Sequence, residues 1–298
     1  MKLILGFSIP LLFGNLFQQF YSMVDTMIVG RVLGTGPLAA VGSTGSITFL
    51  IIGFCLGLCS GFAIPVAQRF GSRDYKELRR FIGNAVWLCV GFGIVLTVLT
   101  VIFCRNILEL MGTPADIIDD AYAYLVVIFA GIPATFLYNM LAGIQRAIGD
   151  SRTPVVILVI ASIINIVLDI VLVVFIPMGV AGAAVATVAS QLIGGVVCLL
   201  YVSKHYEVLK MTREDFKINV PCIKRLLSMG LPMALQTSIT AIGSVILQAS
   251  VNSLGSTVVA SITAGSRLYM FFACAYDAMG VTMSTYLSLI HISEPTRP

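Results

Sequence analysis

The sequence predicts an all-α integral membrane protein, a polytopic bundle of helices. Of its 298 residues, 58% are hydrophobic and only 11% are charged, and the mean hydropathy is +1.00. Soluble domains carry roughly 25% charged residues, so this composition excludes an ordinary soluble fold. Apolar stretches recur along the chain, and each is long enough to cross a bilayer as a helix, which takes about 20 residues.

Eight such stretches are expected, and the polar segments between them give their orientation. They cover residues 8–32, 43–68, 81–103, 121–145, 153–176, 180–203, 226–252 and 257–286. The residues before the first stretch are too few for a cleaved signal peptide, so we expect a retained span.

Basic residues gather in alternate loops, between spans two and three, four and five, and six and seven. The opposite loops hold only Arg31 and Arg105. Lys and Arg stay on the cytoplasmic side, which predicts a multi-pass protein of the plasma membrane with a cytoplasmic amino terminus. Topology alone accounts for the basic loops, so we expect the lipid bilayer, and no nucleic acid, as their partner.

An internal repeat divides the chain into two lobes. Pro10 matches Pro232 and Ser46 matches Ser266, and six spans separate the two copies, so the copies run in the same direction. This is a parallel repeat, which predicts a parent protein of two six-helix lobes and twelve helices. We expect an amino-terminal six-helix lobe, a cytoplasmic linker, two helices of a second lobe and a non-native tail, at residues 1–203, 204–225, 226–286 and 287–298. The tail resembles a translated sequencing adapter, and a genuine polar tail is the alternative.

Two carboxylates lie at membrane depth, Asp25 in the first span and Asp169 in the fifth. Charged residues there are costly and often mark ion or substrate pathways; the alternative is a structural polar contact between helices. At 1.5 Å per residue, both lie roughly 24–25 Å from the cytoplasmic ends of their helices. Asn165 is one turn from Asp169 on the same face, and Thr187 lies at a similar depth in span six. Such hard oxygen ligands suit H⁺ or Na⁺, and two close acids in low dielectric favour a shared proton.

The sequence carries no signature of an enzyme. It has 2 histidines and 7 cysteines, without a nucleophile–base pair, zinc spacing, phosphate loop or dinucleotide fingerprint. Cys55 and Cys59 share a helix face and are interpreted as packing residues. We therefore expect no catalytic residue, no cofactor, and no metal beyond a possible Na⁺ at the acids.

Several motifs are similar to those of the multidrug and toxic compound extrusion (MATE) family. They are Val24-Asp25-Thr26 followed by Val29-Gly30, Gly149-Asp-Ser-Arg-Thr-Pro154, Asn165-x₃-Asp169 and Gly179-Val-Ala-Gly-Ala-Ala-Val-Ala-Thr187. The resemblance covers residues 1–286. It implies a secondary transporter that exports amphipathic, often cationic compounds in exchange for H⁺ or Na⁺, and that acts as a monomer when full length.

The resemblance also implies the roles of particular residues. The family's cation site matches Asp25, Asn165, Asp169 and Thr187. A polar network around the substrate cavity would add Gln18, Tyr21, Tyr124 and Asn139. Pro10 matches a proposed helix hinge, with a static kink as the alternative. Asp277 in span eight matches no family motif, so its role stays open.

Three rival functions remain to be weighed. A lipid-linked oligosaccharide flippase has a related architecture, but its cavity tends to be basic, whereas the charges identified at membrane depth here are mainly acidic. An intramembrane aspartyl protease would need Asp25 and Asp169 as a catalytic dyad, but the Asn and Thr companions and the repeat favour ion binding. A purely structural membrane protein would not need the acids.

Overall fold

The computed structural model describes residues 2–113, 115, 117–252, 273, 276, 279–280 and 282–283. Its elements are α1 (Lys2–Val32), α2 (Thr35–Gly71), α3 (Tyr75–Ile102), α4 (Cys104–Leu110), α5 (Ile118–Ala130), α6 (Ile132–Ala147), α7 (Arg152–Asp169), the π-helix η1 (Ile170–Phe175), α8 (Val180–His205), the 3₁₀ turn η2 (Glu207–Leu209) and α9 (Val220–Asn252). The predicted eighth span with Asp277, and the tail, lie largely outside these residues.

The predicted all-α membrane bundle is confirmed. Among the described residues, five helical stretches are long and apolar enough to cross a membrane, at 36–71, 75–102, 152–175, 180–205 and 220–243. The pair α5 and α6 forms a sixth candidate if the two are taken as one bent span.

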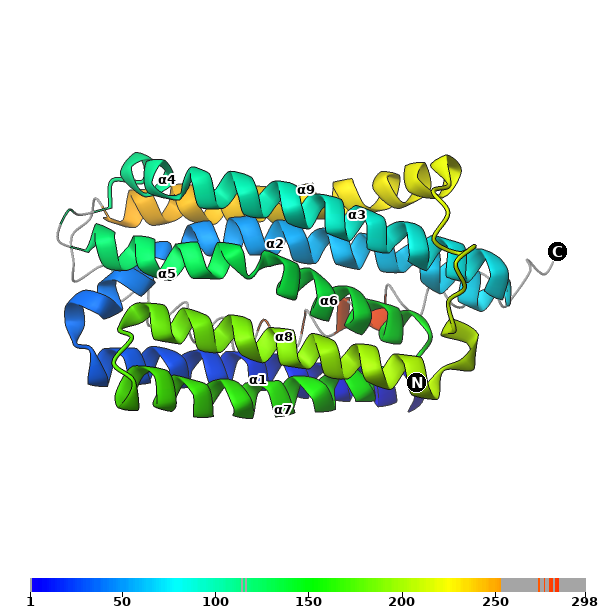
Figure 1. Ribbon diagram of the computed structural model, residues 1–298, viewed down its shortest axis with the longest axis horizontal. Coiled ribbons are helices and arrows are strands. Elements are labelled where there is room, and N and C mark those ends of the chain that lie inside the picture. Colours follow the sequence, from blue (N-terminus) through cyan, green and yellow to red (C-terminus); the bar gives the residue numbers. More distant parts are fainter. Residues whose placement is uncertain are drawn as a thin grey trace.

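The long helices run along one common axis (Figure 1). Helix α1 packs on α7, which packs on α8, and these three lie together on one side of the bundle. Helices α2, α3 and α9 lie on the other side, and α5 and α6 connect the two groups. The amino terminus, the α2–α3 turn, the α6–α7 turn and the segment after α8 share one end of the bundle. The basic loops are therefore gathered at a single end, as the alternation of charge predicts.

The predicted fourth span, at residues 121–145, is built as a bent pair of helices. The chain breaks at Gly131 into α5 and α6, which meet at an angle of 46°. Pro133 stands in the first turn of α6, where its missing N–H costs no helical hydrogen bond. Gly131 also packs closely on α8, because an added Cβ would lie 2.3 Å from a methyl group of Val188. The break thus lets the chain bend around α8.

The fifth span also departs from a regular helix. Helix α7 ends at Asp169 and continues as η1, in which the N–H of Ile176 donates to the carbonyl of Val171 over 2.8 Å. Gly179 then turns the chain with a φ of 61°, a left-handed conformation that favours glycine. Single π-helical turns occur frequently at functional sites, and this one begins directly after a predicted site residue.

The segment between α8 and α9 is fastened to the preceding helices at two places. At the first, the Tyr206 hydroxyl donates to Asp150 in the α6–α7 turn. Burial raises the pKa of Asp150, but hydrogen bonds from Thr153, Tyr206 and the Arg152 N–H outweigh this effect and lower it below the ordinary value.

The second attachment lies on α3. The Asn84 side chain accepts from the N–H of Asn219 over 2.8 Å, and the Trp87 indole donates to the carbonyl of Phe216 over 2.9 Å. Asp215 forms an ion pair with Arg79 at 3.5 Å. The linker therefore has a defined path across α3 up to the first residue of α9.

Candidate functional site

Asp25 and Asp169 come together where α1 packs on α7. Asp169 is the last residue of α7 and is fully buried, at 0% exposure. Asp25 lies two turns before the end of α1 and is half-buried. The two carboxyl groups are close enough to interact directly. The structure therefore brings these two predicted residues together.

Most polar side-chain atoms of this site have no hydrogen-bond partner among the described residues. Both oxygens of Asp169, one oxygen of Asp25, and both polar atoms of the buried Asn165 side chain lack a partner. A buried unpaired charge is strongly unfavourable. Ionised carboxylates only accept hydrogen bonds, so the two acids cannot satisfy one another unless a proton or a cation lies between them. This is the chemical property that defines the site.

An apolar cluster closes the site toward the end of the bundle remote from the amino terminus. It consists of Val29, Val173 and Ala183, with exposures of 0%, 2% and 0%. Val29 follows Asp25 by four residues, Val173 follows Asp169 by four, and Ala183 precedes Thr187 by four. Each therefore lies about one helical turn beyond a predicted site residue. We call Val29, Val173 and Ala183 the outer apolar cluster; it separates the acids from that face.

A small cavity borders Asn165 between α6, α7 and α8. Its volume is about 20 Å³, and its lining includes Asn165, Ser162, Ser190, Gln191 and Tyr138. A cavity of this size holds about one water molecule. Asn165 therefore borders a space for about one water molecule within the α6–α7–α8 group.

Three further predicted residues, Thr187, Tyr124 and Asn139, have described side chains. Thr187 lies on α8 and is half-buried; its carbonyl accepts the Ser190 hydroxyl over 2.9 Å, and its own hydroxyl forms no hydrogen bond with either acid. Tyr124 packs against the main apolar core. The Asn139 amide donates to the Thr135 carbonyl of its own helix over 2.8 Å. Their proposed roles stay predictions.

Three predicted residues lie on α1 without described side chains. They are Gln18, Tyr21 and Pro10, whose backbone is helical. Their contacts with the cavity or with Asp25 therefore lie outside the described part of the structure.

The sequence reasoning missed the polar companions of Asn165. The Thr135 hydroxyl donates to the Gln191 side chain over 2.7 Å, which joins α6 to α8 beside the cavity. Ser162 precedes Asn165 by three residues and Gln191 follows Thr187 by four. Helical spacing from the predicted residues would have found both.

The fold and these paired acids define a polytopic helical membrane protein with two interacting acids between its helices. A family model described as MatE matches residues 10–171, which is more than half of the chain. The chain belongs to the MatE family.

Curated relatives share most of the chain. The "Probable multidrug resistance protein YoeA" of Bacillus subtilis (strain 168) is 31% identical over 94% of this chain and 62% of its own length. The "Multidrug export protein MepA" of Staphylococcus aureus (strain NCTC 8325 / PS 47) is 22% identical over 91% and 60%. The "FAD transporter" of Shewanella oneidensis is 26% identical over 96% and 64%.

A solved structure shows the same architecture. It is described as the outward-facing conformation of a multidrug resistance MATE family transporter, with a TM-score of 0.88 and 25% identity, covering 98% of this chain and 68% of that one. The chain spans 60–64% of the length of the curated relatives named above.

Proposed function

We propose that this chain forms most of a secondary transporter that exports amphipathic, often cationic compounds across the plasma membrane in exchange for H⁺ or Na⁺. The names of YoeA and MepA support the export of drugs. The observation that carries the proposal is the pair of interacting acids, Asp25 and Asp169, of which Asp169 has no donor among the described residues for either of its buried oxygens.

Coupling would follow from competition for these oxygens. With the site empty, the buried Asp169 favours uptake of a proton or Na⁺, because either removes the cost of unpaired charge. Asn165 lies one turn away, and its carbonyl oxygen, which has no partner among the described side chains, would add a neutral ligand. An acidic site also attracts organic cations, so a cationic drug and the coupling ion would oppose each other's binding.

The organisation proposed for the whole protein follows the internal repeat. Residues 1–203 would form the first lobe, 204–225 the cytoplasmic linker and 226–286 the first helices of the second lobe, with residues 287–298 outside the native sequence. The gathering of the basic loops and the amino terminus at one end of the bundle supports a cytoplasmic amino terminus. We propose a monomer without an enzyme activity or a cofactor.

Efflux by variants of the acids tests this function. In the full-length parent protein with its twelve predicted helices, Asp25→Asn or Asp169→Asn should abolish ethidium efflux while leaving expression unchanged, because the site then no longer binds the coupling ion. Asp119→Asn is the matched control, since Asp119 is an exposed acid paired with Arg105 at 3.3 Å. Its efflux should stay normal. Normal efflux by both of the first two variants would refute the coupling role.

A further inference from the structure

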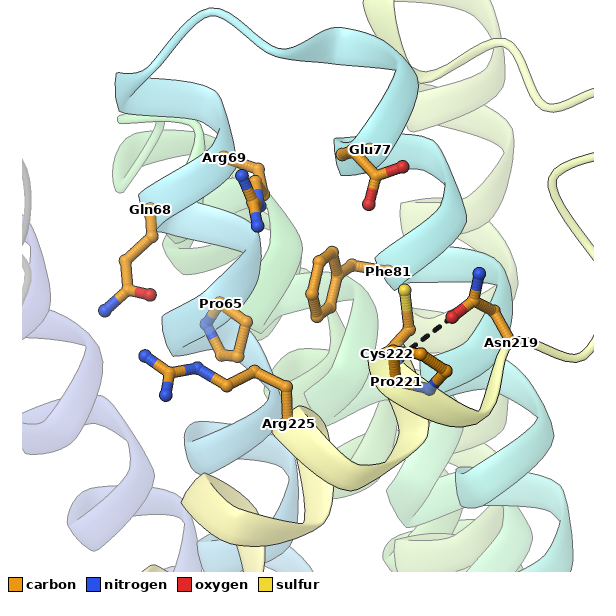
Figure 2. A pocket seen from close by; sticks show the side chains of 9 residues that line it. All are labelled: Pro65, Gln68, Arg69, Glu77, Phe81, Asn219, Pro221, Cys222 and Arg225. Carbon is orange, nitrogen blue, oxygen red and sulfur yellow. Dashed lines mark hydrogen bonds between the residues drawn. The ribbon is translucent and has the colours of Figure 1, made fainter.

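A second cavity lies at the end of the bundle that carries the basic loops. It is bounded by the last turns of α2, the first turns of α3 and the start of α9, and has a volume of about 440 Å³ (Figure 2). This volume falls within the roughly 300–1,000 Å³ of typical small-molecule sites. It is remote from the acids in sequence, and none of the predicted cation-site residues lines it.

Two arginines from different helices line this cavity, Arg69 of α2 and Arg225 of α9. The Arg69 guanidinium lies 5.5 Å from the centre of the Phe81 ring, and its ion pair with Asp74 is long, at 4.0 Å. Phe81 thus holds Arg69 in place while several of its donors stay free.

Arg225 has no salt bridge to any described carboxylate. Figure 2 shows its side chain extending past Pro65 toward Gln68, on the other side of Pro65 from Arg69. The two arginines therefore line the cavity from two different helices.

The single acid in the lining does not neutralise this charge. Glu77 is engaged by Arg80, whose guanidinium donates to it over 2.8 Å. The remaining wall includes the first turn of α9, where Asn219 caps the helix by accepting from the N–H of Cys222 over 3.1 Å. A helix N-terminus adds partial positive charge to the guanidinium groups. The cavity is consequently suited to an anion.

We propose that this cavity binds a phosphate ester through Arg69 and Arg225. The planar fork of N–H donors on an arginine matches the oxygens of a phosphate group. Basic pockets between membrane helices on the cytoplasmic side are known to bind lipid head groups. The same chemistry would also accept a soluble phosphate ester. Because Arg69 belongs to α2 and Arg225 to α9, an occupant links the first predicted lobe to the first helix of the second.

Ligand-dependent thermal stability of the purified 298-residue chain tests this site. In one arm the chain is placed in nanodiscs of phosphatidylcholine with increasing phosphatidylglycerol; in the other, glycerol 1-phosphate is titrated in detergent. The variant pair Arg69→Gln/Arg225→Gln should bind at least about tenfold more weakly in whichever arm stabilises the wild type. The control pair Lys76→Gln/Lys224→Gln removes the same charge from exposed positions outside the cavity lining and should keep the wild-type affinity.

The outcomes are separable. Stabilisation by phosphatidylglycerol alone identifies a lipid head group, and stabilisation by glycerol 1-phosphate identifies a soluble phosphate ester. Stabilisation in neither arm, or an equal loss in the two variant pairs, overturns the site. Arg69→Lys/Arg225→Lys should retain part of the affinity, because the positive charge remains without the guanidinium donor geometry. If the Lys pair and the Gln pair bind the ligand equally weakly while their ligand-free stability is unchanged, direct phosphate contact would be contradicted. None of these readouts depends on transport, so they leave the proposed function untouched.

Discussion

At the scale of single residues, the main feature of the site is the absence, among the described residues, of hydrogen-bond donors to Asp169. Both of its oxygens are buried without a donor in the part of the chain that the structure describes, although Asn165 lies one turn away on the same helix and Asp25 faces it from α1. Protein interiors seldom leave such groups unpaired. The arrangement therefore stores an unfavourable free energy that ion binding can release, which is a useful property in a coupling site and a poor one in a structural contact.

Replacing this acid should stabilise the ion-free protein. Asp169→Asn removes the buried charge and supplies an N–H₂ donor toward Asp25, so the free energy of unfolding should rise by about 1–3 kcal/mol. Thermal unfolding in detergent without Na⁺ measures this. Adding Na⁺ should stabilise the wild type by mass action but not the variant. Asp119→Asn, whose side chain is exposed, is the control, and equal Na⁺ responses of wild type and Asp169→Asn would contradict a cation site at Asp169.

Sequence reasoning located these residues because its two signals are local. A carboxylate inside an apolar stretch is visible in the sequence, and spacing places Asn165 on the same helix face as Asp169. The outer apolar cluster was not predicted. Val29, Val173 and Ala183 are ordinary membrane residues in an apolar stretch, and only the packing of α1, η1 and α8 gives them a shared place.

At the scale of elements, hydropathy predicted where helices lie but not how they bend. The break at Gly131 and the π-helical turn after Asp169 both fall within stretches that remain apolar throughout. Hydropathy carries no information on hydrogen-bond register, so a shift from α- to π-helical bonding leaves it unchanged. The Gly131 and Pro133 pair was a signal for the break, although membrane helices often tolerate such residues.

The contact of α2 with α9 depends on glycine. An added Cβ would lie 2.6 Å from the Ala234 Cα at Gly57, and 2.4 Å from the Gly230 Cα at Gly61. Small residues let membrane helices approach at backbone distance. The four-residue spacing of Gly53, Gly57 and Gly61 was visible in the sequence and could have predicted a close partner for α2, but not which helix provides it.

Substitution in this contact should separate the two helices. Gly61→Ala places a methyl group against backbone, which cannot give way as a side-chain end can, so we expect a loss of about 1–3 kcal/mol in unfolding free energy. Gly91→Ala on α3 is the control, because nothing lies within 4 Å of its added Cβ, and it should be neutral or stabilising. Thermal unfolding in detergent compares the two, and equal stabilities would show that α2 and α9 do not pack this closely.

At the scale of the whole molecule, ion binding and transport make different demands on the chain. The acids and Asn165 lie on α1 and α7, which belong to the first predicted lobe and pack directly together. The repeat predicts that the substrate cavity forms between two lobes, and the chain covers only 62% of the length of YoeA. The parallel repeat was readable from sequence, whereas the attachment of the linker to α3 was not, because Asn84, Trp87 and Asp215 carry no pattern that links them.

This difference gives a prediction for the 298-residue chain itself. Purified and reconstituted in vesicles, it should bind Na⁺ or H⁺ at Asp25 and Asp169, since both acids and Asn165 belong to this chain. It should show no ion-driven efflux of ethidium, since the substrate cavity is predicted to form between two complete lobes. Ion binding is measured by the Na⁺-dependent release of protons, which Asp25→Asn/Asp169→Asn should abolish. The full-length parent protein should show both ion binding and ion-driven ethidium efflux in the same vesicles. Ion-driven efflux by a 298-residue chain that cross-linking shows to be a monomer would contradict the need for a second lobe. Efflux by a cross-linked dimer would instead show that a second copy supplies that lobe.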